Sequence, residues 1–417
     1  MDRRSFVSRS ATTLGAVAAA RTGAFDVPPP SLEGITPQAK PAPITDDERR
    51  TRIEKARRLM AENGIDAMFL EGGSSMLYFT GVHWGNSERT FGVVIPAKGE
   101  LAWVTPAFEE ERARELIKGS TDVRVWQEDE SPFQVIAGIL KDRGVTNGKV
   151  GMEERVRFFI ADGVRQRLPS AQYVIATPVT AGCRTIKSAA EISLMQHANE
   201  ITLQAIGATL KALKPGMSQH DVSSNVASVT QRLGGTSDGA LVIFGKYTAF
   251  PHGSSQPQTL REGDVVLVDA GCTVDGYVSD ITRTTVFGRP TQRQRDVWEI
   301  EKRAQNAAFN AAQVGAACES VDAAARKVIT DAGFGPGYKV PGLPHRTGHG
   351  IGLDGHEWTN LVRGNKTPIR PGMCFSNEPT IAIYGEFGVR LEDCMYITPG
   401  GARMFTRQSP AIDQPFG

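Results

Sequence analysis

The sequence lacks the long hydrophobic runs and the clustered positive charge that two common functional classes require. No stretch of about 20 apolar residues occurs in the chain, so we expect no membrane-spanning helix. The 417 residues include 47 basic and 46 acidic side chains, for a net charge of +1, and no basic run of the kind that tracks nucleic acid. We therefore expect no nucleic acid among the partners. The length of the chain is that of two or three globular domains.

Cysteine is scarce, and its spacing indicates no disulfide framework. The chain has five cysteines, an odd number, and none of them belongs to a CxxC pair. Because free cysteine behaves as a small apolar residue, we expect all of them to be buried structural thiols. They are Cys183, Cys272, Cys318, Cys374 and Cys394.

The first 44 residues differ in composition from the rest. Residues 1–24 begin with Arg3-Arg4 and continue into a mildly apolar, alanine-rich run, which resembles a twin-arginine export signal. The alternative is a tail with a chance pair of arginines. Residues 25–44 are rich in proline and predict a linker. We therefore expect a periplasmic or secreted protein, or a cytoplasmic one if the leader is not functional.

Residues 45–182 predict an α/β domain that contains no catalytic cluster. A helix is expected from Asp46 and Asp47, whose charges favour a helix N-terminus, to Gly64. Short strands are expected at 67–70, 91–96 and 101–104.

Residues 183–417 predict an α+β domain. Ser188 and Glu191 form a capping box at the start of a helix that ends before Pro215-Gly216. Later strands are expected at 265–270, 278–286 and 389–397.

Two aspartates in this second domain would meet if their strands form a hairpin. Asp269 ends the apolar run 265–268, and Asp280 follows a turn at 274–276. A buried carboxylate needs a cation or a network of donors, so such a pair indicates a metal site. The hairpin alone leaves an alternative open, in which Asp275 and Asp280 serve only the turn and an ion pair with Arg283.

Three further segments add side chains of the metal-ligand type. His349 lies between Gly348 and Gly350, which allow close approach of the backbone on both sides. Glu378 precedes a proline, and Glu392 lies on an apolar strand. One imidazole with four carboxylates suits manganese, iron, cobalt or zinc, and four carboxylates offset the charge of two divalent ions.

These motifs resemble the pita-bread metallopeptidases, which include aminopeptidase P, prolidase and methionine aminopeptidase. All five ligand-type residues occur in the family's order within the second domain. The first domain resembles the N-terminal domain of aminopeptidase P, prolidase and creatinase, which methionine aminopeptidases lack. The resemblance therefore implies an α/β N-terminal domain, a pita-bread catalytic domain and the Xaa-Pro branch of the family.

The resemblance also implies a role for each ligand. Asp269 would chelate one metal ion, His349 and Glu378 would bind the other, and Asp280 and Glu392 would bridge the two. Manganese is the metal we expect, with cobalt, zinc or iron as alternatives.

Four more residues match the family's pattern. His252, His345 and His356 correspond to histidines that orient substrate, move protons or stabilise the tetrahedral intermediate. Arg390, two residues before Glu392, would pair with the bridging carboxylates or meet a substrate carboxylate, or would only support the ligands.

The implied reaction is hydrolysis of the peptide bond before proline, by an Xaa-Pro dipeptidase or an Xaa-Pro aminopeptidase. A hydroxide that bridges the metals would attack the carbonyl carbon, His252 or His356 would stabilise the oxyanion, and Glu378 would carry the proton to the leaving nitrogen. The expected partners are a peptide or dipeptide substrate and further copies of the chain, in a homodimer or higher homo-oligomer.

Other chemistry on the same fold remains open from the sequence. One alternative is a lyase similar to dimethylsulfoniopropionate lyase. The other is a hydrolase that acts on organophosphates or on amides other than Xaa-Pro peptides. Creatinase-like chemistry is disfavoured because the ligand set is complete. A binding module without enzymatic activity is a remote alternative, since such modules have lost ligands.

Overall fold

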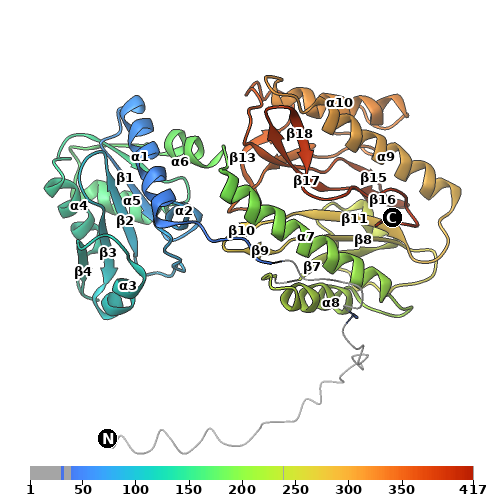
Figure 1. Ribbon diagram of the computed structural model, residues 1–417, viewed down its shortest axis with the longest axis horizontal. Helices are drawn as coiled ribbons and strands as arrows, with labels where there is room; N and C mark the ends of the chain where they lie inside the picture. Colours follow the sequence, from blue (N-terminus) through green and yellow to red (C-terminus); the bar gives the residue numbers. More distant parts are fainter. Residues whose placement is uncertain (1–29, 32–38, 238, 417) are drawn as a thin grey trace, which may run out of the picture.

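The computed structural model describes residues 30–31, 39–237 and 239–416. The predicted export leader and most of the predicted linker lie outside these residues. Within the described ranges, no helix combines the length and the apolar character that a membrane crossing needs. Figure 1 shows two folded parts side by side, with α6 (Thr177–Arg184) at the end of the first and α7 (Ala189–Lys211) at the start of the second.

The N-terminal part is a six-stranded sheet in the order β4-β3-β2-β1-β5-β6. Its elements are α1 (Asp46–Asn63), β1 (Ala67–Glu71), α2 (Ser74–Thr80), β2 (Gly92–Pro96), β3 (Ala102–Pro106), η1 (Ala107–Glu109), α3 (Glu110–Leu116), β4 (Val123–Trp126), α4 (Pro132–Asp142), β5 (Lys149–Met152), α5 (Phe158–Arg167) and β6 (Gln172–Ile175), followed by α6. Successive residues of β1 point to opposite faces, so Met68 packs in the core with α1, α2 and α6, and Phe69 packs in the core with α4 and α5.

The predicted helix and strands of this part are confirmed, with strand ends shifted by one or two residues. The side chain of Thr45 caps α1 by accepting from Glu48 N, and Gly64 ends the helix in the left-handed conformation at φ 61°.

The C-terminal part has two larger sheets between two pairs of helices, together with the two-stranded sheets β10-β9 and β15-β16. Its elements are α7, α8 (Gln219–Arg232), β7 (Ala240–Phe244), η2 (Gly245–Ala249), β8 (Val265–Ala270), β9 (Thr273–Val274), β10 (Tyr277–Val278), β11 (Ile281–Val286), α9 (Gln292–Ala311), α10 (Cys318–Asp331), β12 (Gly348–Gly350), β13 (Glu357–Leu361), β14 (Cys374–Asn377), β15 (Thr380–Ile383), β16 (Phe387–Arg390), β17 (Asp393–Thr398) and β18 (Gly401–Met404).

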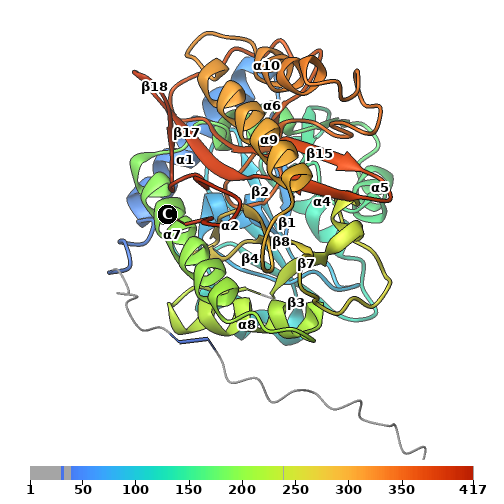
Figure 2. The ribbon, with the colours of Figure 1, turned by 90° about the vertical axis from the view of Figure 1, so that its right-hand side faces the viewer.

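One of the larger sheets has the order β11-β8-β7, and the other has the order β13-β12-β14-β17-β18. Helices α7 and α8 share a core with the first sheet, and α9 and α10 share a core with the second. Figure 2 shows these two helix pairs on opposite sides of the strands. The predicted capping box is present, because Ser188 accepts from Glu191 N and Glu191 accepts from Ser188 N.

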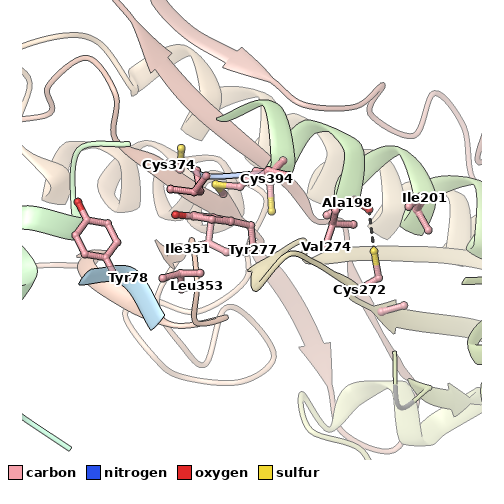
Figure 3. Close-up of a cluster of buried hydrophobic side chains, with 14 of the residues drawn as sticks. Tyr78, Ala198, Ile201, Cys272, Val274, Tyr277, Ile351, Leu353, Cys374 and Cys394 are labelled. Atoms are coloured by element: carbon pink, nitrogen blue, oxygen red, sulfur yellow. Dashed lines mark hydrogen bonds between the residues drawn. The ribbon is translucent and has the colours of Figure 1, made fainter. Parts of the chain in front are cut away.

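The five cysteines are free and buried, as predicted. Figure 3 shows Cys272, Cys374 and Cys394 in the core that α7 and α8 share with the sheet β11-β8-β7. There the Sγ atom of Cys272 donates to the carbonyl of Ala198 at 3.2 Å. Burial raises the pKa of Cys374 to about 12, so its thiol stays protonated at neutral pH. The same core contains Tyr78 from α2, and it therefore joins the N-terminal and C-terminal parts.

Two predicted strands are interrupted where they carry carboxylates. The strand expected at 278–286 is divided into β10 and β11, and the strand expected at 389–397 is divided into β16 and β17. The backbone N–H of Glu392 donates to the carbonyl of Thr282 at 3.1 Å, so the chain bonds to β11 at this point. The two interruptions leave Asp280 and Glu392 between strands, where their side chains face the same site.

Candidate metal centre

The five predicted ligands come together where the three-stranded and the five-stranded sheet of the C-terminal part meet. Asp269 lies on β8, Asp280 precedes β11, His349 lies on β12, Glu378 follows β14, and Glu392 separates β16 from β17. One donor atom each from Asp280, His349 and Glu392 lies within 4.8 Å of the others. These segments are far apart in the sequence, so only the folded chain creates the cluster.

The imidazole of His349 is oriented toward the carboxylates. Its Nε2 atom lies 3.0 Å from Oε1 of Glu378 and 3.8 Å from Oδ2 of Asp280. Its Nδ1 atom lies 3.1 Å from the carbonyl oxygen of Gly350. A carbonyl at Nδ1 favours the tautomer with the proton there, which leaves the lone pair of Nε2 facing the carboxylates, as metal ligation requires.

The glycines beside His349 are required by close backbone contacts, as predicted. A Cβ atom at Gly348 would lie 2.2 Å from the carbonyl oxygen of Ser376, and one at Gly350 would lie 2.7 Å from that of Trp358. Neither contact is sterically allowed. The glycines therefore let β12 approach its neighbours closely enough to bring His349 into the cluster.

The charge of the cluster fits divalent cations. Burial raises the pKa of Asp280 and of Glu392 well above the usual range, and the neighbouring carboxylates raise both further. The Oε1 atom of Glu392 is buried without a hydrogen-bond partner in the described part of the chain. Four acidic oxygen donors and one imidazole, with an unused buried oxygen among them, suit two divalent metal ions.

Arg390 pairs with a predicted ligand. Its Nη2 atom forms an ion pair with Asp269, its Nε donates to Oγ1 of Thr282 at 3.0 Å, and its Nη1 donates to the carbonyl of Pro251 at 2.8 Å. Of the roles predicted for Arg390, the structure shows contact with a site carboxylate. That carboxylate belongs to Asp269 and not to either residue predicted to bridge.

Thr282 links this arginine to the ligand shell. Its hydroxyl accepts from Arg390 and donates to Oε2 of Glu392 at 2.7 Å. We expect Thr282→Val to weaken metal binding about 10- to 100-fold, because the ligand carboxylate loses the donor that orients it. Calorimetric titration with Mn²⁺ measures the change. Thr285→Val, on the same strand but bonded to the carbonyl of Ile412, is the matched control, and equal losses in both variants would contradict the prediction.

In the alternative reading of the β9–β10 hairpin, the turn role of Asp275 is confirmed and the ion pair of Asp280 with Arg283 is wrong. Asp275, at φ 48°, and Gly276, at φ 88°, form the turn, and the carboxylate of Asp275 pairs with Lys40 at 2.5 Å. Arg283 pairs instead with Asp393 at 2.6 Å, in a contact with no exposed side-chain surface. Asp280 therefore does not serve that ion pair and is free to face the cluster.

A pocket of about 560 Å³ opens beside the ligands. The predicted residues Glu378 and Arg390 and all three predicted histidines line it, and the remaining wall comes from Phe250, Pro251, Pro344 and Arg346. The structure thus places every predicted site residue either in the ligand cluster or on this pocket. Their individual roles remain predictions.

The histidines of the pocket are held differently. His345 has two partners, the carbonyl of Arg346 at 2.7 Å from Nδ1 and the hydroxyl of Thr380 at 3.0 Å from Nε2. The ring of His356 lies 4.1 Å from that of His349, centroid to centroid. Burial, His349 and Arg346 lower the pKa of His356 to about 4, so this imidazole is neutral at neutral pH.

Arg346 was not predicted from the sequence. Its side chain lines the pocket, and among the described residues no carboxylate forms an ion pair with it. Its position directly after a predicted pocket histidine is the only signal in the sequence that could have indicated it. An unpaired guanidinium beside the pocket is suited to bind a carboxylate.

Comparisons with known proteins match both parts of the chain. Residues 193–399 match the profile of Metallopeptidase family M24, and residues 52–186 match that of the Creatinase/Prolidase N-terminal domain. An uncharacterized peptidase of Schizosaccharomyces pombe is 35% identical over 390 residues, which cover 88% of this chain and 82% of the relative. The Xaa-Pro dipeptidase of Lactobacillus delbrueckii subsp. lactis is 31% identical over 365 residues, which cover 86% and 98%. A crystal structure of prolidase from Thermococcus sibiricus has a TM-score of 0.80 at 29% identity, covering 87% of this chain and 98% of that one. The predicted fold class, with its pita-bread catalytic domain, is confirmed.

Proposed function

Because the chain belongs to metallopeptidase family M24, with a creatinase/prolidase N-terminal domain, we propose that it hydrolyses Xaa-Pro dipeptides with two divalent metal ions. The observation that carries this proposal is the cluster of all five ligand-type residues beside a pocket with an apolar wall and one unpaired guanidinium. A relative and a solved structure named Xaa-Pro dipeptidase and prolidase support the choice of a dipeptide over a longer peptide.

The metal ions would be held by Asp269, Asp280, His349, Glu378 and Glu392. When bound, they lower the pKa of water and polarise the scissile carbonyl. Manganese is the metal we propose first, because carboxylate-rich sites with one imidazole suit it.

The residues of the chain then act on the proton and on the developing charge. Glu378 lies at both the ligand cluster and the pocket, so it can take a proton from water and pass it to the leaving nitrogen. His356 is neutral at neutral pH and can donate a hydrogen bond to an oxyanion, a role that His252 on the same pocket can share.

The pocket suits a C-terminal proline. The nitrogen of an Xaa-Pro bond is a tertiary amide without a hydrogen, so recognition depends on the shape of the ring. Phe250, Pro251 and Pro344 supply an apolar wall for such a ring, and Arg346 can bind the free carboxylate of a dipeptide.

We expect Arg346→Met to remove the preference for a free carboxylate. The wild-type protein should cleave Ala-Pro more efficiently than its C-terminal amide, Ala-Pro-NH₂. The substitution removes a charged hydrogen bond to the substrate carboxylate, which is worth about 1.5–3 kcal/mol. This corresponds to a fall of roughly 10- to 150-fold in kcat/KM for Ala-Pro, with no such fall for Ala-Pro-NH₂. Steady-state kinetics with both substrates measures it. An equal fall for acid and amide would contradict the assignment, because the effect would then not depend on the carboxylate.

A substrate panel tests the proposed function itself. The Mn²⁺-loaded protein should hydrolyse Ala-Pro, with little hydrolysis of Ala-Pro-Ala and of Ala-Ala. Cleavage of Ala-Pro-Ala at the first bond would indicate an Xaa-Pro aminopeptidase instead. No cleavage of any proline-containing peptide would refute the proposal and leave the lyase and the other hydrolases on this fold.

Two further features are proposed from the sequence and from the family's properties. We propose that the chain assembles as a homodimer or higher homo-oligomer, and that residues 1–24 direct its export. Light scattering of the purified protein tests the first. Cell fractionation with Arg3 and Arg4 both replaced by lysine tests the second, because accumulation of the substituted protein inside the cell is expected.

A further inference from the structure

The loop that carries His356 is held at both ends by residues from outside the catalytic domain's sheets. His356 lies between Asp354 and Glu357, and both of these carboxylates form ion pairs and do not line the pocket. The partners come from α6, from the segment after it and from the N-terminal part. The loop is therefore a point at which the two parts of the molecule meet beside the active site.

Glu357 is the more deeply buried of the two carboxylates. It forms ion pairs with Arg184 and with Nζ of Lys187, the latter at 2.9 Å. Burial alone would raise the pKa of Glu357, but Lys187 and Arg184 lower it to about 2, so it is ionised at neutral pH. Its Oε1 atom also accepts from the backbone N–H of Leu353 at 2.9 Å and of Asp354 at 3.1 Å, which fixes the turn before His356.

Asp354 binds three residues that precede α7 in the chain. Its Oδ2 atom lies 2.6 Å from Nη2 of Arg184, and its Oδ1 atom accepts from Nη1 of Arg155 at 2.7 Å and from the hydroxyl of Ser74 at 2.5 Å. Arg184 continues the network, because its Nη1 atom donates to the hydroxyl of Ser75 at 3.1 Å.

Apolar packing supports the same attachment. Ile351 and Leu353, which lead into the loop, belong to one buried core with Tyr78 of α2 and with Tyr277. Figure 3 shows these four side chains in that core.

His356 itself has little to hold it. The residue is only partly shielded by the pocket, and in the described part of the chain no hydrogen-bond partner fixes its imidazole. Among the described residues its one ring contact is with His349, so the position of the imidazole depends on the backbone from 353 to 357. The contacts of Asp354 and Glu357 fix that backbone, and Arg184 forms an ion pair with each of these two carboxylates.

We infer that Arg184, acting through Asp354 and Glu357, is a positioning residue for His356, and that the N-terminal part contributes to the reaction by fixing this loop. The inference rests on the proposed function for its effect on rate. A displacement of about 1 Å at a group that acts on the transition state can cost up to about 100-fold in rate. Binding of the dipeptide depends instead on the apolar wall and on Arg346, so KM should change little.

A double-mutant cycle tests the inference. Arg184→Met, His356→Ala and the double variant are assayed on Ala-Pro with Mn²⁺. We expect Arg184→Met alone to lower kcat about 10- to 100-fold with KM nearly constant, and to have little further effect once His356 is alanine. Losses in kcat that multiply in the double variant would overturn the inference, because Arg184 would then act by another route. Arg293→Met, which removes an exposed ion pair with Glu386, is the control and should leave kcat unchanged.

Amide hydrogen exchange gives a readout that does not depend on activity. In metal-free protein, Arg184→Met should speed exchange in peptides covering 351–358 and leave those of α9 and α10 unchanged. If the wild-type protein fails to cleave Ala-Pro, the proposed function fails, and the exchange measurement still tests the attachment of the loop. Unchanged exchange at 351–358 would overturn it. If Arg184→Met does not fold, Asp354→Asn removes the same ion pair with a side chain of equal size, and the same results are expected.

Discussion

Replacing Asp280 with asparagine should remove both metal binding and hydrolysis. Asp280 is central to the ligand cluster, within reach of His349 and Glu392. Losing a residue that hydrogen-bonds to a metal ligand costs roughly 10- to 100-fold. Loss of the negative charge of Asp280 itself should lower kcat/KM by more than that. Metal analysis by mass spectrometry and steady-state kinetics measure the two effects.

The same substitution should not destabilise the metal-free protein. Burial and the neighbouring carboxylates raise the pKa of Asp280 because charge is unfavourable there, so a neutral side chain of similar shape relieves repulsion. A lower melting temperature would therefore contradict this account of the charge. Asp275→Asn, at the turn before it, is the control and should keep metal and activity. A fully active Asp280→Asn variant would remove Asp280 from the ligand set.

Replacing Arg283 with methionine should cause the largest loss of stability of any single substitution considered. Arg283 and Asp393 form an ion pair with no exposed side-chain surface, and Arg283 also donates to the carbonyls of Glu392 and Arg407. Removing one partner of a buried pair costs about 3–5 kcal/mol, because the carboxylate of Asp393 would stay buried with only the neutral donors Gln305 and Thr406 beside it. We expect the melting temperature of the metal-free protein to fall by roughly 5–10 °C.

A second substitution separates the charge from the packing. Combining Arg283→Met with Asp393→Asn removes the uncompensated charge, so part of the lost stability should return. Arg293→Met, at a pair whose side chains are 52% and 50% exposed, should change the melting temperature little. A double variant less stable than Arg283→Met alone would show that the remaining aspartate was not the source of the cost.

The residues of the candidate ligand cluster could be predicted from the sequence because they have local signatures. Asp269 ends an apolar strand, and His349 lies between two glycines whose places no larger side chain could take. Helix ends could be predicted for a similar reason, since the capping box at Ser188 depends on residues three positions apart. Such features need no knowledge of distant contacts.

The interruptions of two strands and the network of supporting ion pairs could not be predicted from the sequence. The apolar pattern continues through Asp280 and Glu392, so the sequence predicted unbroken strands where the chain turns to direct these carboxylates inward. The pairing of Arg283 with Asp393 joins residues 110 positions apart, and that of Arg184 with Asp354 joins residues 170 apart. No periodicity or spacing connects such residues, because the contacts exist only after the sheets and the two parts of the chain have packed.

Activity of the metal-stripped protein on Ala-Pro during titration with Mn²⁺ tests most directly whether this is a two-metal Xaa-Pro dipeptidase. We expect no hydrolysis after chelation, then activity that rises with bound metal and reaches its plateau at two ions per chain. The Asp280→Asn variant should neither bind the metal tightly nor gain activity. Full hydrolysis by the stripped protein, or saturation with Mn²⁺ without any hydrolysis of Ala-Pro, would contradict the account.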